Sequence, residues 1–347
     1  MTVDSPVFAV LGRPFRCHIE TSSVLAWLDR HWRRDEHVTP PHGYTVELVE
    51  GAGPADVAGY AGGAGGPADL AENAEGAGGP AGDGGRGHDA RWEPEIVRLP
   101  DGITLSWARR GNEWVWHGSE VYVHLRLADD GARIRFRFGA DVFPALYVAV
   151  SEALRASGLL PLHAAVVVRD GVASAIAAPS GTGKTTTLVR LLSRGWSPLA
   201  EDLSWLDPGT YTLYGWDRGL RLWSDGLARV GPALAAAPWG VDPDGKRFLD
   251  WADVGVPRVP RARLARVVLL QRDATRPTCL EPLSPREAVR VLWEATGVPL
   301  SPGVRAVVNE HVARLLRELE FQRLRLGPDS EADLPPQVLG PPQAFGG

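Results

Sequence analysis

The sequence contains little cysteine and no cluster of basic residues. Its 347 residues include only two cysteines, Cys17 and Cys279, which are far apart and lack any CxxC or Cys/His pattern. This argues against a zinc site or a disulfide framework and fits a reducing cytosol. Lys and Arg number 37 against 42 Asp and Glu, so the formal net charge is −5. Because nucleic-acid-binding chains usually carry clustered Lys and Arg, nucleic acid is not an expected partner.

Long hydrophobic runs are also lacking. No stretch approaches the roughly 20 apolar residues that cross a membrane. The N-terminus shows no basic segment followed by an apolar run, so it does not resemble a signal peptide. We therefore expect a cytoplasmic protein with no membrane partner. What is abundant is core material, since 44% of the residues are hydrophobic and 13 are Trp, which suffices for one large domain or two.

Composition divides the chain into five segments. Residues 51–90 are mostly Gly, Ala, Pro and acidic residues, which cannot bury enough apolar surface to offset the entropy of ordering. We expect a disordered insertion there, with a partner-binding segment as the alternative, and a second disordered segment at 327–347. The flanking parts, 1–50 and 91–158, are expected to form one β-rich N-terminal domain, and 159–326 a second domain.

Several elements follow from hydrophobic periodicity. Alternating apolar residues over 121–127 and 133–138, separated by a turn sequence, predict a β-hairpin. Trp114 and Trp116 are spaced for one face of a sheet and are expected in the core, and 141–158 has the spacing of a helix. In the second domain the expected strands are 163–168, 172–179, 197–206 and 264–272, and the expected helices run to about 192 and over 284–296 and 304–319.

The sequence "APSGTGKTTT" resembles a phosphate-binding loop between a buried strand and a helix. Glycines let backbone N–H groups converge on phosphate oxygens, the lysine neutralises charge, and the following hydroxyl binds magnesium. The helix N-terminus also favours phosphate. The alternative is an ordinary strand–helix turn. The expected nucleotide-binding residues are Ser180, Gly181, Thr182, Gly183, Lys184, Thr185 and Thr186, and Thr185 is an expected metal ligand.

One position departs from the usual GxxxxGK[ST] pattern. The first glycine is replaced by Ala178. Alanine can occupy this position only where the backbone keeps a negative φ. We therefore expect a conventional backbone conformation there.

Two further features lie near the loop in sequence. Glu201 and Asp202 interrupt an otherwise apolar strand, where an acidic pair is costly unless it meets a cation. One carboxylate could hold Mg²⁺ while the other accepts a proton; the alternative is a solvated strand end. His163 enters the strand that precedes the loop, as an active-site residue or as a hydrogen-bonded core histidine.

Together, "LHAAVVV", "APSGTGKTTTLVRLLSRGW" and "LAEDLSW" resemble the catalytic domain of the HPr kinase/phosphorylase family in order and spacing. The resemblance covers about 160–206 and extends loosely over 264–296. It implies an α/β fold with a P-loop kinase core of the HPr kinase/PEP carboxykinase type. Members phosphorylate a serine on a small carrier protein or on a ribosomally made peptide. Carrier-protein kinases of this family form hexamers, so a homo-oligomer is an implied partner.

The resemblance also implies roles. Lys184 and Thr185 become the phosphate and magnesium ligands, Glu201 the proton-accepting carboxylate, Asp202 a metal ligand and His163 an active-site residue. The family usually has Asp first in the acidic pair. Because Glu201 is one methylene longer, the base and metal-ligand roles of Glu201 and Asp202 could be exchanged.

The expected function is therefore that of an ATP- and Mg²⁺-dependent kinase. It would transfer the γ-phosphoryl group to a Ser or Thr hydroxyl of a peptide or small protein, such as a natural-product precursor peptide. Two alternatives remain open. One is a nucleotide-binding regulatory partner without transfer activity, and the other is a small-molecule kinase.

Overall fold

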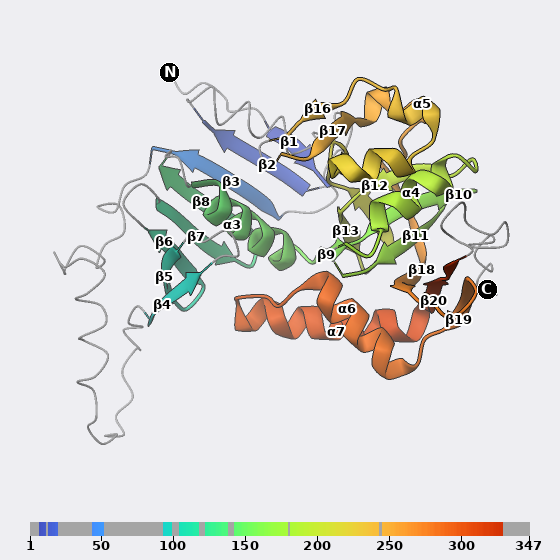
Figure 1. The fold of residues 1–347 in the computed structure, drawn as a ribbon. Coiled ribbons are helices and arrows are strands. Elements are labelled where there is room, and N and C mark those ends of the chain that lie inside the picture. Colours follow the sequence, from blue (N-terminus) through green and yellow to red (C-terminus); the bar gives the residue numbers. More distant parts are fainter. Residues whose placement is uncertain are drawn as a thin grey trace, which may run out of the picture. The chain divides into compact units, whose positions relative to one another are not determined.

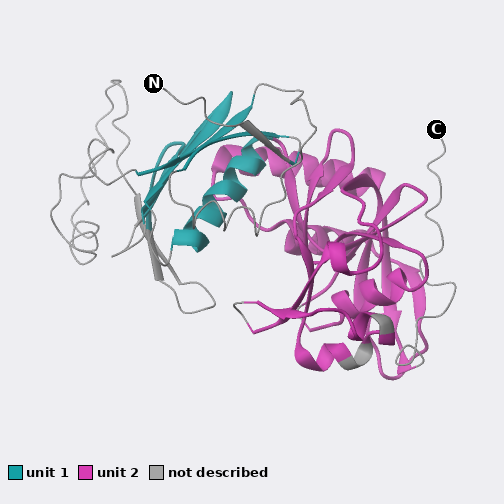
Figure 2. Cartoon of the chain, turned by 90° about the horizontal axis from the view of Figure 1, so that it is seen from above, with its two compact units in different colours: residues 1–28, 34–157 teal, residues 29–33, 158–347 magenta. Residues whose placement is uncertain are grey.

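The chain forms two compact units, which Figure 2 colours separately. The computed structural model describes residues 7–11, 13–19, 44–51, 93–98, 104–117, 122–137, 142–179, 181–242 and 245–328. One unit comprises 1–28 and 34–157, and the other comprises 29–33 and 158–347. The predicted disordered segments lie outside the described residues, except for Gly51 and the first residues of the tail. Both units combine sheet and helix, so the chain is mixed α/β.

The first unit is built on an eight-stranded sheet (Figure 1) with the strand order β1-β2-β3-β8-β7-β6-β5-β4. Its strands are β1 (Val7–Val10), β2 (Arg13–His18), β3 (Thr45–Glu50), β4 (Glu93–Arg98), β5 (Thr104–Arg110), β6 (Glu113–His117), β7 (Tyr122–Ala128) and β8 (Gly131–Arg137). Among its described residues, the helix α3 (Val142–Ala156) packs against β7 and β8. Strands β2, β3 and β8 pair in parallel, and the remaining pairs are antiparallel.

The sequence predictions for this unit are confirmed at most positions. β7 and β8 form the expected antiparallel hairpin, and α3 lies within the segment predicted as a helix. Trp114 and Trp116 are both buried, as expected of residues on one face of a sheet. The predicted end residues Val121 and Phe138 lie outside the described residues.

The second unit has a nine-stranded mixed sheet. Seven strands follow the order β12-β10-β11-β18-β14-β13-β9, and β20 joins β18 to β19. The strands are β9 (Leu160–His163), β10 (Ala165–Arg169), β11 (Val172–Ala177), β12 (Ser197–Ala200), β13 (Leu203–Asp207), β14 (Thr212–Gly215), β18 (Arg261–Arg272), β19 (Cys279–Pro282) and β20 (Glu320–Leu326). β11 and β20 both run parallel to β18.

The prediction of single strands at 163–168 and 197–206 was wrong. His163 ends β9 and pairs with Leu203, whereas Val166 of β10 pairs with Ala200 of β12. Both pairs belong to one antiparallel register. The two segments therefore form a ladder, which shifts register between Val166 and Val167 and opens at the point between the two pairs named above. That point contains Glu201 and Asp202, which lie in a bend rather than in a strand.

Three helices of the second unit match the expected segments: α4 (Lys184–Leu192), α6 (Pro285–Thr296) and α7 (Pro302–Glu318). Ser284 caps α6 as predicted, since its side chain accepts the N–H of Glu287 while the Glu287 side chain accepts from the Ser284 N–H. This reciprocal pair satisfies two of the amides that a helix leaves unpaired at its start. The N-cap of α4 is instead Gly183, which has no side chain to accept a hydrogen bond from the first amides of the helix.

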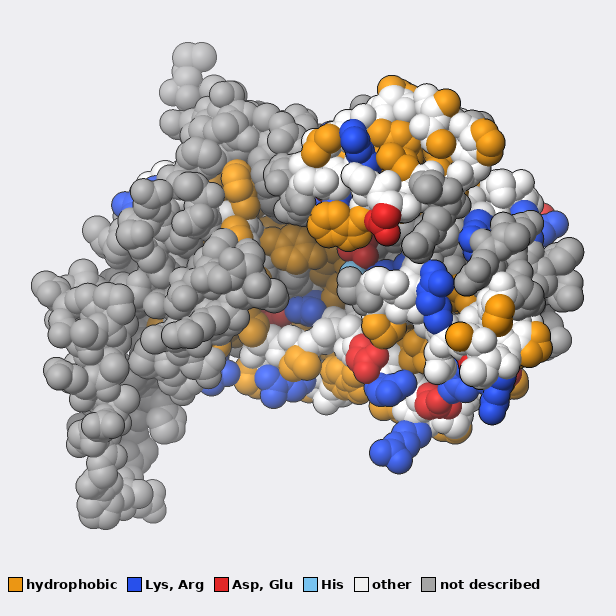
Figure 3. Space-filling view, in the orientation of Figure 1, with side chains coloured by type: hydrophobic (Ala, Val, Ile, Leu, Met, Phe, Trp, Pro, Cys, Tyr) orange, Lys and Arg blue, Asp and Glu red, His pale blue; other side chains and the backbone are white. Residues whose placement is uncertain are grey.

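A smaller three-stranded sheet packs against α4. It has the order β15-β17-β16, and its buried leucines share one hydrophobic cluster with Leu188 and Leu191 of α4. Its elements are β15 (Gly219–Leu222), η2 (Ser224–Arg229), α5 (Pro232–Ala235), β16 (Gly240–Val241), β17 (Arg247–Asp250) and η3 (Trp251–Asp253). Hydrophobic side chains also gather on the surface of this lobe in Figure 3, where Trp223 and Val241 are exposed. The phosphate-loop helix is thus held between the main sheet and this lobe.

Candidate active site

The glycine-rich loop connects β11 to α4. Gly181 has a φ of +76° and Gly183 a φ of +110°, conformations that side chains with a Cβ rarely adopt. The loop therefore requires glycine at both positions. The positive-φ residues other than glycine in the described chain do not include Ala178, so the departure from the usual pattern is accommodated without strain. Ser180 lies outside the described residues.

The first turn of α4 completes the loop. The Thr187 N–H donates to the Gly183 carbonyl at 2.9 Å, and the Thr182 N–H donates to the Pro179 carbonyl at 3.3 Å. Thr186 is half-buried in this turn. The N–H groups before the first helical bond are those that a helix leaves without an internal partner. They lie at the positive end of the helix dipole, where an anion is favoured.

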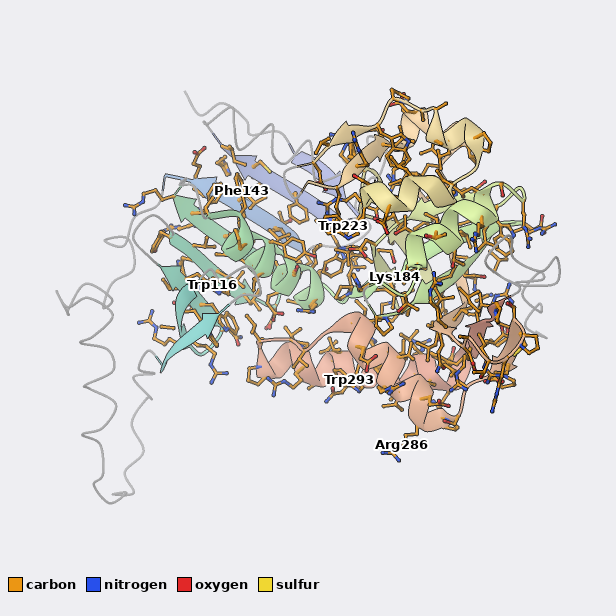
Figure 4. The ribbon with its side chains drawn as sticks, in the orientation of Figure 1. Trp116, Phe143, Lys184, Trp223, Arg286 and Trp293 are labelled. Carbon is orange, nitrogen blue, oxygen red and sulfur yellow. The ribbon has the colours of Figure 1, made fainter. Side chains whose placement is uncertain are left out.

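Lys184 brings two of the predicted residues together. Its side chain is only 9% exposed, and its Nζ lies 2.5 Å from Nε2 of His163 and 3.3 Å from Oδ1 of Asp202. Figure 4 labels Lys184 in the region where α4 meets the main sheet. Residues from the end of β9, the start of α4 and the bend after β12 therefore converge at one place.

His163 is neutral in this arrangement. Burial lowers its pKa, an effect that nearby Asp202 opposes and Lys184 reinforces. The Lys184 ammonium can only donate, so Nε2 of His163 is the acceptor and Nδ1 carries the proton. Nδ1 lies 3.5 Å from Oδ1 of Asp202. The histidine thus links Lys184 to Asp202, and with 49% of its side chain exposed it is not a core residue.

The two carboxylates of the acidic pair have different surroundings. Glu201 is 5% exposed and accepts a hydrogen bond from the Thr185 hydroxyl. Burial raises its pKa to about 8, and the charges of Asp202 and Asp217 add to this. Asp202 has 46% of its side chain exposed. Glu201 therefore faces the loop hydroxyl from inside the protein, while Asp202 is accessible to a second molecule.

Asp217 is a site residue that the sequence analysis missed. Its Oδ2 accepts the backbone N–H groups of Glu201, Asp202 and Leu203 at 2.7, 2.8 and 3.3 Å. Successive N–H groups of a straight strand point to opposite sides, so three can meet one oxygen only where the strand breaks. Asp217 thus explains why the ladder opens at the acidic pair.

Further contacts hold Asp217 in place. The Trp251 indole N–H lies 3.0 Å from its carbonyl oxygen and 3.2 Å from its Oδ1. Burial raises the pKa of Asp217, although the N–H donors and Arg258 act in the opposite direction. An acidic residue following the aromatic stretch "LYGW" was the available signal, because burying it has the same cost that drew attention to Glu201.

The oxygen atoms in this cluster suit a magnesium ion bound with a nucleotide. No group of three or more His, Cys, Asp or Glu side chains able to hold a metal occurs among the described residues. Magnesium at nucleotide sites is usually held by one or two carboxylates together with phosphate oxygens. The Thr185 hydroxyl and the Glu201 carboxylate, already in contact, provide donors of this kind.

Comparison with protein-family models and with curated proteins gives no assignment for this site. No protein-family model matches the chain, and a search of curated proteins gives no match. In the part of the chain that the structure describes, no helix is long and apolar enough to cross a membrane. The chemistry of the site must therefore be inferred from its own residues.

Proposed function

We propose that this protein is an ATP-dependent kinase with a P-loop core of the HPr kinase type. It transfers the γ-phosphoryl group to a Ser or Thr hydroxyl of a peptide or small protein. The observation that carries the proposal is the meeting of the loop with the acidic pair, because Lys184 contacts Asp202 and Thr185 contacts Glu201. A strand–helix turn without function would not need two carboxylates beside its lysine and hydroxyl.

The topology around the loop supports the same proposal. The loop follows β11, whose parallel neighbour is β18, and it leads directly into α4 at Lys184. Nucleotide phosphates bind in this position in strand–loop–helix units. We therefore expect the loop to bind ATP, with Lys184 beside the phosphates.

The geometry favours an exchange of the roles implied by family resemblance. Glu201 is buried against Thr185, so we assign these two residues to Mg²⁺, which when bound neutralises phosphate charge. Asp202 is half-exposed beside neutral His163, so we assign it as the base. A base must reach the proton it removes, and of the two carboxylates Asp202 is the accessible one.

The steps performed by the chain are then simple. Lys184 neutralises phosphate oxygens, and Asp202 orients the acceptor hydroxyl and takes its proton as the oxygen attacks phosphorus. His163 positions both Lys184 and Asp202 through its two ring nitrogens. Positioning and electrostatic stabilisation account for most of the acceleration in phosphoryl transfer, and this cluster provides both.

The test uses γ-labelled ATP, Mg²⁺ and a panel of Ser- and Thr-containing peptides. We expect label on a peptide with the wild type, and at least about a 100-fold loss with Lys184→Ala and Asp202→Asn. Matched controls are Lys246→Ala, which alters the only other lysine, and Asp253→Asn at an exposed position. Both should keep full activity.

Three outcomes would contradict the proposal. Failure of the wild type to bind nucleotide would remove it altogether. Tight binding without labelled acceptor across a broad panel would favour a regulatory partner. Label on metabolites but not on peptides would favour a small-molecule kinase.

A further inference from the structure

An arginine at the end of β18 lies beside the phosphate loop. β18 runs parallel to β11, and the register places Leu269 beside Ala177, the last residue of β11. β18 continues to Arg272. Its final residues therefore extend past the end of β11 and run alongside the loop, so the sheet itself fixes the position of Arg272.

The guanidinium contacts the loop backbone directly. Nε of Arg272 donates to the Thr182 carbonyl at 2.9 Å. A Cβ built at Gly183 would lie only 3.1 Å from Nη2 of Arg272. The guanidinium thus rests against the last two residues before Lys184. Because a guanidinium carries five N–H donors, the bond to Thr182 leaves donors for another group.

The charges around Arg272 favour the binding of an anion beside the phosphate loop. In the described part of the chain Arg272 forms no ion pair, and the adjacent Asp273 is already held by Arg276 and Arg325 at 3.9 and 3.7 Å. Arg272 and Lys184 both flank the start of α4, where the helix dipole disfavours cations. Lys184 has Asp202 as a counter-charge, whereas Arg272 has only a carbonyl oxygen. An anion in the loop would remove this imbalance.

We propose that Arg272 binds the γ-phosphate of ATP, an inference that rests on the proposed kinase function. A guanidinium can donate two parallel N–H bonds to phosphate oxygens. During transfer the acceptor oxygen bonds to the γ-phosphorus and its proton goes to Asp202. The bond from phosphorus to the β–γ bridging oxygen breaks, and ADP keeps the electron pair. Arg272 neutralises the charge that develops on these oxygens, as arginine does in other phosphoryl-transfer sites.

The experiment compares ATP with ADP. Dissociation constants for both, with Mg²⁺, are measured by calorimetry for the wild type, Arg272→Ala, Arg272→Lys and the control Arg276→Ala, together with the Tm of each. We expect Arg272→Ala to weaken ATP binding about 10- to 100-fold and ADP binding by about 3-fold or less, since the lost hydrogen bonds are charge-assisted. Arg272→Lys should lie between, and Arg276→Ala should match the wild type.

Two results would overturn the inference. An equal loss of ATP and ADP affinity in Arg272→Ala would mean that the guanidinium only holds the loop. Unchanged affinity for both would mean that it does not reach the nucleotide. If Arg272→Ala has a lowered Tm, the Arg272→Lys variant is used instead. A larger loss of affinity for ATP than for ADP in that variant supports the inference, and an equal loss overturns it. Failure of the proposed function is distinguishable, because it appears as an unlabelled peptide panel or as a wild type that binds neither nucleotide, whereas the role of Arg272 is read from the ratio of ATP to ADP affinity.

Discussion

Glu152 in the first unit and Glu201 in the second are both buried carboxylates, but their partners differ. In the first unit Glu152 is fully buried and bonds to Arg155, one turn further along α3, at 2.6 Å. In the second unit Glu201 is buried and Asp217 is half-buried, and within the described residues neither forms an ion pair; their partners include the Thr185 hydroxyl and backbone N–H groups. Burial raises the pKa of both. The charge of a carboxylate paired with an arginine is already neutralised. A carboxylate whose partners are only hydroxyl and N–H groups can still bind a cation.

The largest expected effect tests how Asp217 is held. Asp217→Ala leaves three backbone N–H groups without their acceptor, so we expect the free energy of unfolding to fall by about 3–6 kcal/mol. Asp217→Asn keeps an oxygen acceptor and should lose less than half as much. Urea denaturation measures both. Equal stability of the two variants would show that the N–H groups find other partners.

A smaller effect is expected from the first unit. Arg155→Met keeps an aliphatic side chain but removes the cation beside Glu152, and we expect a loss of about 3 kcal/mol. The double variant Glu152→Gln/Arg155→Met should recover part of this loss, because no unpaired charge remains. Binding of Mg·ATP should be unchanged in both. If Arg155→Met were as stable as the wild type, Glu152 would not depend on Arg155, and its contrast with Glu201 would be wrong.

The smallest effect concerns pH. The pKa of Glu201 lies at about 8 against an ordinary value of 4.5, so its protonated form contributes stability below pH 4.5 that is lost as the pH rises through 8. We expect the wild type to lose about 1–2 kcal/mol more than Glu201→Gln between pH 5 and 8, with neighbouring carboxylates sharing the titration. Denaturation curves at a series of pH values measure the difference.

The same residue gives a second readout. A cation beside Glu201 favours its ionised form, so binding of Mg·ATP at pH 7 should release up to about one proton from the wild type. Glu201→Gln should release fewer. Calorimetry in buffers of different ionisation enthalpy counts these protons. Equal release from both proteins would place the cation elsewhere.

Much of the local structure could be predicted from the sequence. The β7–β8 hairpin and the capped helix α6 follow from turn and capping residues that act on their close neighbours in the chain. The phosphate loop could also be predicted from neighbouring residues, because Gly181 and Gly183 adopt the positive φ angles that the loop requires. Predictions of this kind depend on short-range chemistry.

Tertiary placement could not be predicted in the same way. The sequence around Asp217 indicates only a loop residue. Its contact with the amides of Glu201 and Asp202 becomes visible in the folded structure. The sequence places Arg272 only at the end of a strand. Its contact with Thr182 depends on the register between β11 and β18. The break between β12 and β13 has the same origin, since it exists because Asp217 draws three amides to one side. Apolar alternation alone predicts an unbroken strand there.

The position of β18 has a consequence for how the chain folds during synthesis. Its parallel neighbours are β11, made much earlier, and β20, which ends at Leu326. Pairings between distant segments form slowly because the intervening chain must first be closed into a loop. The first unit is complete once Ala156 has been made and can fold as the chain emerges. The phosphate loop is synthesised before β18, so its contact with Arg272 can form only after 90 further residues have been made.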